Sequence, residues 1–139
     1  MTREWLEAHG RDWDLVVECA DTFGAKYMVA DWCAEAGVPL VWGTVVAMAY
    51  QVSVFWSRPP APVPPTSLRS LHPVEPAPGT PPASPEAGVL GPVVGQAGTT
   101  MATEALKVVA GFGEPLLGRV LVVDAAKQRA DVLTFAPWG

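Results

Sequence analysis

The chain has 139 residues, half of them hydrophobic, which suits a single domain with a substantial core. Its net charge of −5 and pI of about 4.9 argue against nucleic acid as a partner, because phosphate backbones are bound by basic faces. The N-terminal stretch MTREWLEAHGRDWD is too polar for a signal peptide. We therefore expect a soluble, cytoplasmic protein.

The N-terminal third of the chain predicts a strand–helix–strand unit. A short amphipathic helix over residues 2–9 precedes it. Residues 14–20 are expected to form a strand, because LVVECA has the near-continuous apolar character of a parallel strand covered on both faces. Residues 23–36 then form a helix and residues 39–46 a second strand, so the two strands should be parallel. Residues 50–56 turn back as a further strand.

The helix predicted over residues 23–36 has one apolar and one polar side. Its apolar residues repeat at helical spacing: Met28, Val29, Trp32, Cys33 and Ala36. Lys26, Asp31 and Glu35 are expected to face water. Gly37 and Pro39 end the helix in the usual order.

The uncharged run over residues 38–56 approaches the roughly 20 residues of a membrane span. Its second part alternates in the period-two pattern of a strand, so we expect sheet and no membrane association. A proline-rich segment follows, with eleven prolines in the twenty-seven residues from Pro59 to Pro85. Because proline at that density blocks helices and central strands, residues 57–87 are predicted to be an extended, largely mobile crossover loop.

The C-terminal part predicts a helix over residues 89–111 and a hairpin over residues 118–135. The helix carries a series of small residues through which we expect it to pack closely: Gly91, Gly95, Gly98, Ala102 and Ala105. The two strands of the hairpin are joined by a short turn near residues 126–128, so they should be antiparallel. The expected fold class is thus α/β: one βαβ unit, further strands, a long crossover loop, a packed helix and a terminal hairpin.

The two cysteines, Cys19 and Cys33, are expected to be buried thiols in a reducing compartment. Together with two distant histidines, His9 and His72, they do not make a zinc site. The chain also lacks a P-loop, a G-x-G-x-x-G motif, an H-E-x-x-H motif and a Ser/His/Asp arrangement.

Asp21 is the candidate functional residue, because it follows a predicted strand at the sheet edge where open α/β folds bind ligands. Two interpretations are open. As the N-cap of the next helix, its carboxylate would accept backbone N–H bonds. As a metal ligand, it would hold Mg²⁺ against a triphosphate. Spacing alone favours the cap.

Several blocks of the chain, in order, resemble the ThiF/MoeB/HesA superfamily. The blocks cover about residues 12–135 and read DLVVECADTFGAKYMVADWC, PLVWGTV, QVSVFW, PEAGVLGPVVG, ATEALKVVAGFGEPLLGR and LVVDA. The resemblance implies a Rossmann-like fold and ATP-dependent adenylation of the C-terminal glycine of ubiquitin-like sulfur carriers in thiamin or molybdopterin biosynthesis. It implies that Asp21 is the catalytic, magnesium-coordinating aspartate and that Lys26 binds the phosphates of ATP in place of an arginine.

The chain departs from the family pattern at several positions. Residues 47–51 replace an R-x-E-G-Q turn, and Ser67 and Ser70 stand where the family has a zinc-binding C-x-x-C. Ser84 replaces a crossover-loop cysteine that some members use for sulfur transfer. We therefore expect no zinc.

The resemblance also covers only the C-terminal half of the family's domain. We therefore expect residues 1–139 to be a single partial domain without the glycine-rich ATP loop, the arginine finger and the basic residues that bind the triphosphate. Three functional hypotheses follow. The chain is half of a split adenylating enzyme, a non-catalytic module that binds a carrier or a homologue (including itself as a homodimer), or a degenerate remnant.

Overall fold

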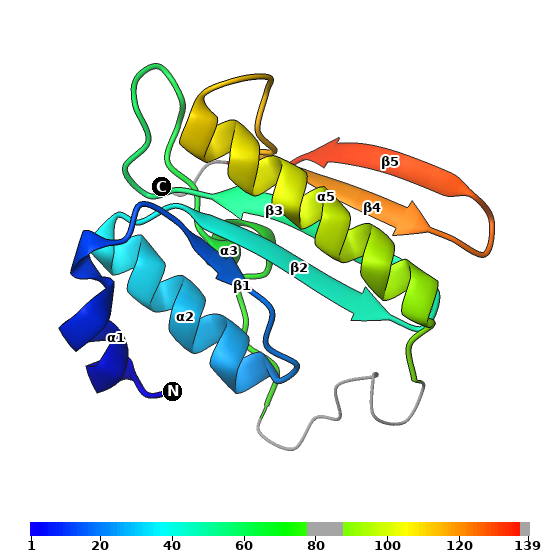
Figure 1. Cartoon of the computed structure of the whole chain (residues 1–139), viewed down its shortest axis with the longest axis horizontal. Helices are drawn as coiled ribbons and strands as arrows, with labels where there is room; N and C mark the ends of the chain where they lie inside the picture. Colours follow the sequence, from blue (N-terminus) through cyan, green and yellow to red (C-terminus); the bar gives the residue numbers. More distant parts are fainter. Residues whose placement is uncertain (78–87, 137–139) are drawn as a thin grey trace.

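The computed structural model describes residues 1–77 and 88–136, and it contains a five-stranded mixed sheet with the strand order β1–β2–β3–β4–β5. The strands are β1 (Val16–Glu18), β2 (Leu40–Val46), β3 (Ala49–Phe55), β4 (Arg119–Asp124) and β5 (Arg129–Thr134). The helices are α1 (Arg3–His9), the 3-10 turn η1 (Gly10–Asp12), α2 (Phe23–Ala36), α3 (Leu68–Leu71) and α5 (Gly91–Ala110). Helices α2 and α5 run along the sheet as separate layers (Figure 1).

Sheet pairing confirms the expected βαβ unit and hairpin. β1 pairs in parallel with β2, with Val16 opposite Leu40, and every later pair is antiparallel. Between these two strands, α2 spans the predicted residues and ends at Gly37 in the left-handed conformation (φ 76°) that favours glycine. The uncharged run over residues 38–56 forms β2 and β3. None of the helices in the described part of the chain combines the length and the apolar character that a membrane crossing requires.

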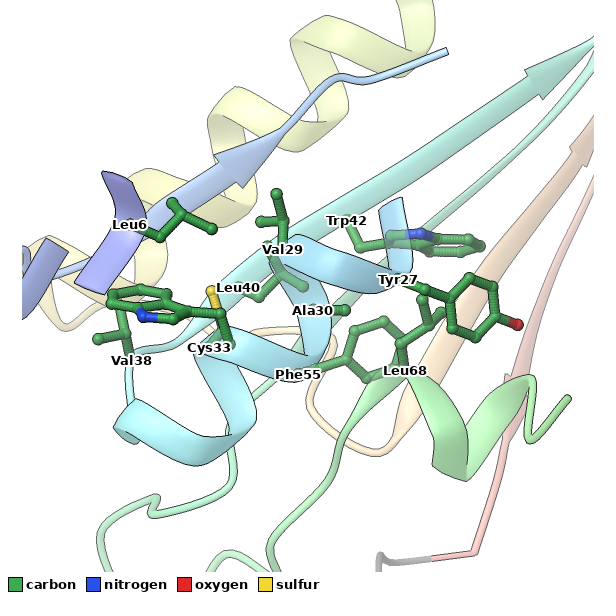
Figure 2. Packing of buried hydrophobic residues seen from close by; sticks show 11 residues of the cluster. Leu6, Tyr27, Val29, Ala30, Cys33, Val38, Leu40, Trp42, Phe55 and Leu68 are labelled. Atoms are coloured by element: carbon green, nitrogen blue, oxygen red, sulfur yellow. The ribbon is translucent and has the colours of Figure 1, made fainter. Parts of the chain in front are cut away.

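Two apolar clusters fill the two sides of the sheet, because successive side chains of a strand point to opposite faces. Leu40 and Trp42 of β2 pack with α1, α2 and α3, and Figure 2 shows this cluster around Tyr27, Val29, Cys33 and Leu68. Val41 of β2 packs with α5 on the other side.

Strand β1 is shorter than predicted, and the expectation that it is covered on both faces is wrong. It has three residues instead of seven, and the side chain of Val17 is 46% exposed. The reason is its position: β1 lies at the end of the sheet, and α5 packs over β2 and β3.

Helix α5 occupies almost the predicted residues, but of the small residues through which it was expected to pack, only Ala105 contacts a core cluster, and it is partly buried there. Gly91, Gly95 and Gly98 have open space where a Cβ would stand. The buried face instead consists of Val93, Ala97, Met101 and Glu104. The close approach is made by the sheet: a Cβ on Gly43 of β2 would stand 2.5 Å from the sulfur of Met101.

The proline-rich segment is more ordered than predicted in its described part. Within it, α3 buries Leu68 to 2% exposure against the α2 side of the sheet. Arg69 forms two hydrogen bonds to the carboxylate of Asp31, both at 2.8 Å. The hydroxyl of Tyr27 donates to the carbonyl oxygen of His72 at 3.0 Å. Residues 66–72 are therefore packed against the α2 side of the sheet, whereas residues 78–87, with Ser84, lie outside the described chain.

Candidate functional site

The turn after β1 places Asp21 at the carboxyl end of the strand with an exposed side chain. The N-cap of α2 is Thr22, whose hydroxyl accepts a hydrogen bond from the backbone N–H of Ala25 at 3.3 Å. The interpretation of Asp21 as the helix cap is therefore wrong. Within residues 1–77 and 88–136, the carboxylate of Asp21 takes part in no hydrogen bond or ion pair, so it is available to a ligand.

A pocket of about 300 Å³ lies beside this turn, between the carboxyl ends of β1 and β2 and the first half of α5. Its lining includes Asp21, Phe23, Lys26, Gly43, Val46, Val94 and Met101. The two predicted site residues, Asp21 and Lys26, are thus brought to one pocket. Its position at the carboxyl edge of a parallel strand pair is where open α/β sheets bind ligands.

Lys26 is the clearest departure from prediction, because it was expected to face water and is 8% exposed. Its ammonium group lies 3.0 Å from a carboxylate oxygen of Glu18 and donates to the carbonyl oxygen of Gly43 at 2.7 Å. It also lies 5.9 Å from the ring centre of Trp42. Two strong acceptors therefore hold the charge in place, and Lys26 is poorly suited to neutralise a triphosphate.

Glu18 completes this arrangement and was not singled out from the sequence. Its side chain is buried at 1% exposure, and its second carboxylate oxygen accepts a hydrogen bond from the backbone N–H of Ala20 at 2.5 Å. The pair of Glu18 and Lys26 thereby ties the last residues of β1 to the first turn of α2 and, through Gly43, to β2. We infer that it fixes the backbone of the turn that carries Asp21. The signal in the sequence was an acid within an apolar strand, since such a residue is rarely buried without a partner.

The two cysteines differ in environment. Cys33 is buried as predicted, and burial raises the pKa of its thiol to about 12. Cys19 is exposed and lines the pocket, so the prediction that it is buried is wrong. It follows Glu18 at the end of the strand, where the chain leaves the sheet.

Magnesium fits the site better than zinc does. Magnesium in nucleotide sites needs only one or two carboxylates, with phosphate oxygens and water completing its shell, and Asp21 is such a carboxylate. Zinc sites in proteins use three or four close side-chain ligands, and the described residues contain no group of three or more His, Cys, Asp or Glu side chains that could hold a metal ion. At the family's zinc motif, the hydroxyl of Ser70 accepts a hydrogen bond from the backbone N–H of Ser67 at 3.1 Å. The hydroxyl of Ser70 thus provides an acceptor for a backbone N–H at the start of α3.

Two curated relatives show how far the similarity in sequence extends. The probable adenylyltransferase/sulfurtransferase MoeZ of Mycobacterium tuberculosis is 39% identical over 124 residues, which are 89% of this chain and 31% of MoeZ. The sulfur carrier protein adenylyltransferase of Thermus thermophilus is 40% identical over 124 residues, 89% of this chain and 46% of that protein. The chain therefore spans less than half the length of these relatives.

The fold is shared with solved structures at low identity. The microcin C7 biosynthetic enzyme MccB, in complex with N-formylated MccA, superposes with a TM-score of 0.77 at 15% identity, covering 98% of this chain and 42% of MccB. Escherichia coli MccB with ATP superposes with a TM-score of 0.72 at 14% identity, covering 98% of this chain and 40% of MccB. The sequence profile of the ThiF family matches residues 1–137. The chain therefore belongs to the ThiF family.

Proposed function

We propose that this chain contributes the magnesium-binding part of an adenylation site for the C-terminal glycine of a ubiquitin-like sulfur carrier, of the kind used in thiamin or molybdopterin biosynthesis. In this proposal, Asp21 holds the Mg²⁺ of MgATP, and the cations that contact the triphosphate come from polypeptide outside these 139 residues. The observation that carries the proposal is the exposed carboxylate of Asp21 on the rim of the pocket, which has no partner among residues 1–77 and 88–136.

The position of Asp21 supports a ligand role because no described residue pairs with its carboxylate. Thr22 caps the helix, and the buried pair of Glu18 and Lys26 fixes the turn from below. Because this pair holds the turn, little free energy should be needed to position the carboxylate of Asp21 when a cation binds. Bound magnesium would offset the negative charge of the phosphates during transfer of the adenylyl group.

The need for further cations follows from the lining of the pocket. Lys26 is the one basic residue among its described lining residues, and both Glu18 and Gly43 hold its ammonium group. Phosphoryl chemistry depends on positioned positive charge, so the isolated chain should not catalyse it. The Thermus thermophilus relative is named as an adenylyltransferase, but this chain spans only 46% of its length.

A second candidate function is a non-catalytic module that binds a carrier or a homologue. It is supported by the same lining, which is mostly apolar and offers a phosphate no free cation among the described residues. In this case a carrier protein would bind without nucleotide chemistry. A degenerate remnant, the third hypothesis, would show no cooperative unfolding.

ATP–pyrophosphate exchange distinguishes these functions. The chain is mixed with a carrier protein ending in Gly-Gly, first alone and then with the segment of the Thermus thermophilus adenylyltransferase that lies outside the aligned stretch. We expect magnesium-dependent exchange only with that segment, and a loss of at least about 100-fold in Asp21→Ala. Asp14→Ala, which changes another exposed carboxylate near β1, is the matched control and should retain exchange.

Two results would contradict the catalytic proposal. One is exchange that persists in Asp21→Ala, and the other is magnesium-dependent exchange by the chain alone. Binding of the carrier in calorimetry, with no exchange under any condition, would favour the non-catalytic module instead.

A further inference from the structure

Another pocket, of about 420 Å³, lies at the end of α2 that is remote from Asp21. It is enclosed by α1, η1, the last turn of α2 and the segment that follows β3, and Figure 1 shows α1 beside this end of α2. It shares no lining residue with the pocket at Asp21. Because α2 has 14 residues, the length of this helix separates the two pockets by about 20 Å. The chemistry of this pocket is therefore independent of the proposed adenylation site.

Positive charge gathers in this pocket, although the chain as a whole is acidic. Three of the nine Lys and Arg residues of the chain line it: Arg3, Arg11 and Arg58. The acids in its lining are Glu7 and Glu35. Three arginines against two glutamates leave a net charge of +1 in a chain whose net charge is −5. We call this the arginine pocket.

The three guanidinium groups differ in how many of their donors are already used. Arg3 donates to Glu7 at 3.1 Å and also to Glu35, so it holds both acids of the lining. Arg58 donates through one nitrogen to the backbone carbonyl oxygen of Glu35 at 3.0 Å. No described residue accepts a hydrogen bond from Arg11 or from the other nitrogens of Arg58. Because a guanidinium presents five donors in a fixed fork, these two side chains are suited to bind an oxyanion.

The C-terminal end of α2 does not oppose an anion as a free helix end would. Its carbonyl groups are used by donors from the segment after β3. The indole N–H of Trp56 donates to the carbonyl oxygen of Gly37 at 3.1 Å, and the hydroxyl of Ser57 donates to that of Ala34 at 2.6 Å. The stem of Arg58 packs on Gly37, where a Cβ would stand 2.8 Å from its Cδ. Arg58 is thus held at the pocket while the negative end of the helix is neutralised.

Trp32 gives the arginine pocket a polar donor that the protein does not use. Its side chain lines the pocket and is only 3% exposed, and its indole N–H donates to no residue in the described part of the chain. The indole nitrogen of Trp42 is fully enclosed by protein, but that of Trp32 is not. Since the pocket is the open space that Trp32 lines, its N–H is available there to an acceptor. A bound oxyanion would supply the missing hydrogen bond.

We propose that the arginine pocket binds a small molecule through an oxyanion group, either a phosphate or a carboxylate. Arg11 and Arg58 form charge-assisted hydrogen bonds to it, the indole N–H of Trp32 adds a third donor, and Arg3 with its two glutamates forms the wall. The volume of the pocket is in the range of small-molecule sites, about 300–1,000 Å³, so the ligand has a body beyond its oxyanion. This site goes beyond the proposed function and does not depend on it.

An NMR titration of the wild-type chain tests the site without relying on activity. The signal of the Trp32 indole N–H, assigned from its loss in Trp32→Phe, is followed as sodium phosphate or sodium acetate is added. Sodium chloride at matched ionic strength is the control, because it screens charge without offering an oxyanion. We expect a saturable shift that chloride does not produce. The oxyanion that binds more tightly identifies the group as phosphate or carboxylate.

Arg11→Gln is the test variant, because Arg11 is exposed and has no described partner whose loss would disturb the fold. Arg129→Gln is the matched control, since it removes an exposed arginine from β5. We expect Arg11→Gln to weaken oxyanion binding by about tenfold or more and Arg129→Gln to change it by less than about twofold. Arg58→Lys keeps the charge and loses the fork, so it should weaken binding as well. The thermal midpoint of each variant shows whether it is folded.

The proposal is overturned if neither oxyanion shifts the Trp32 signal beyond the effect of chloride. It is also overturned if Arg11→Gln binds as the wild type does, or if Arg129→Gln weakens binding equally, because binding would then reflect overall charge. Shifts confined to the turn that carries Asp21 would place the ligand in the other pocket and would overturn it too. Asp21→Ala should leave oxyanion binding here unchanged, so failure of this site and failure of adenylation are separate results.

Discussion

Replacing Lys26 by methionine tests whether the buried pair holds the site turn in place. The substitution keeps most of the side-chain volume and removes the charge, leaving the carboxylate of Glu18 at 1% exposure without its cation. At a separation of 3.0 Å and an effective dielectric constant of about 20, the attraction between the two charges amounts to roughly 5.5 kcal/mol. Breaking a buried pair by removing one partner costs about 3–5 kcal/mol in measured cases.

We expect Lys26→Met to lower the free energy of unfolding by about 3–5 kcal/mol, measured by urea denaturation followed by circular dichroism. The double variant with Glu18→Gln and Lys26→Met should be more stable than Lys26→Met alone, because no buried charge is left unpaired. The carbonyl oxygen of the introduced glutamine would still accept the hydrogen bond from the backbone N–H of Ala20. A loss below about 1 kcal/mol in Lys26→Met, the value typical of exposed pairs, would refute the reasoning. So would strictly additive effects of the two substitutions.

Three further predictions concern the crossover segment, pH and the cysteines. Leu68→Ala should cost about 2–5 kcal/mol in urea denaturation because Leu68 is 2% exposed in the core, whereas Val74→Ala, at an 80% exposed position, should change stability by less than about 0.5 kcal/mol. Equal effects would show that α3 is not packed as described. Burial lowers the pKa of His72 below its ordinary value of 6.5, so the unfolded chain takes up a proton first and stability should fall as the pH drops below about 6.5. Urea denaturation between pH 8 and pH 5 should show a smaller fall in His72→Gln than in the wild type, and an unchanged fall would contradict this. Under native conditions at pH 8, iodoacetamide should modify Cys19 and spare Cys33, whose pKa burial raises to about 12; mass spectrometry after Cys19→Ser should then find no native labelling.

Local patterns in the sequence were sufficient for most of the secondary structure. Helix α2 occupies the predicted residues, because the apolar spacing and Gly37 act within one element. The pairing of β1 with β2 followed from the short βαβ connection, and the hairpin of β4 and β5 from its turn. These features depend on neighbours in the chain, so the sequence alone reveals them.

Exposure was harder to predict, because it depends on residues distant in the chain. The glycines of α5 are exposed, since the sheet meets the helix through Val93, Ala97 and Met101. Residues 68 and 69 of the proline-rich segment are packed, because Leu68 is buried in the core and Arg69 forms a hydrogen bond to Asp31, thirty-eight residues earlier. Proline density described the backbone and carried no information about these contacts.

Some features of the candidate site could likewise be predicted from the sequence, and others appeared only in the folded structure. The sequence by itself identified Asp21 at the end of a strand, a family resemblance that the ThiF match confirms, and the absence of a phosphate-binding glycine motif. Only the tertiary structure decided that Thr22 caps the helix and that Lys26 is buried against Glu18 and Gly43. The physical reason is that the position of a charged side chain depends on the partner with which it pairs. In the folded chain, Glu18 at the end of β1 lies beneath the first turn of α2, where it pairs with Lys26.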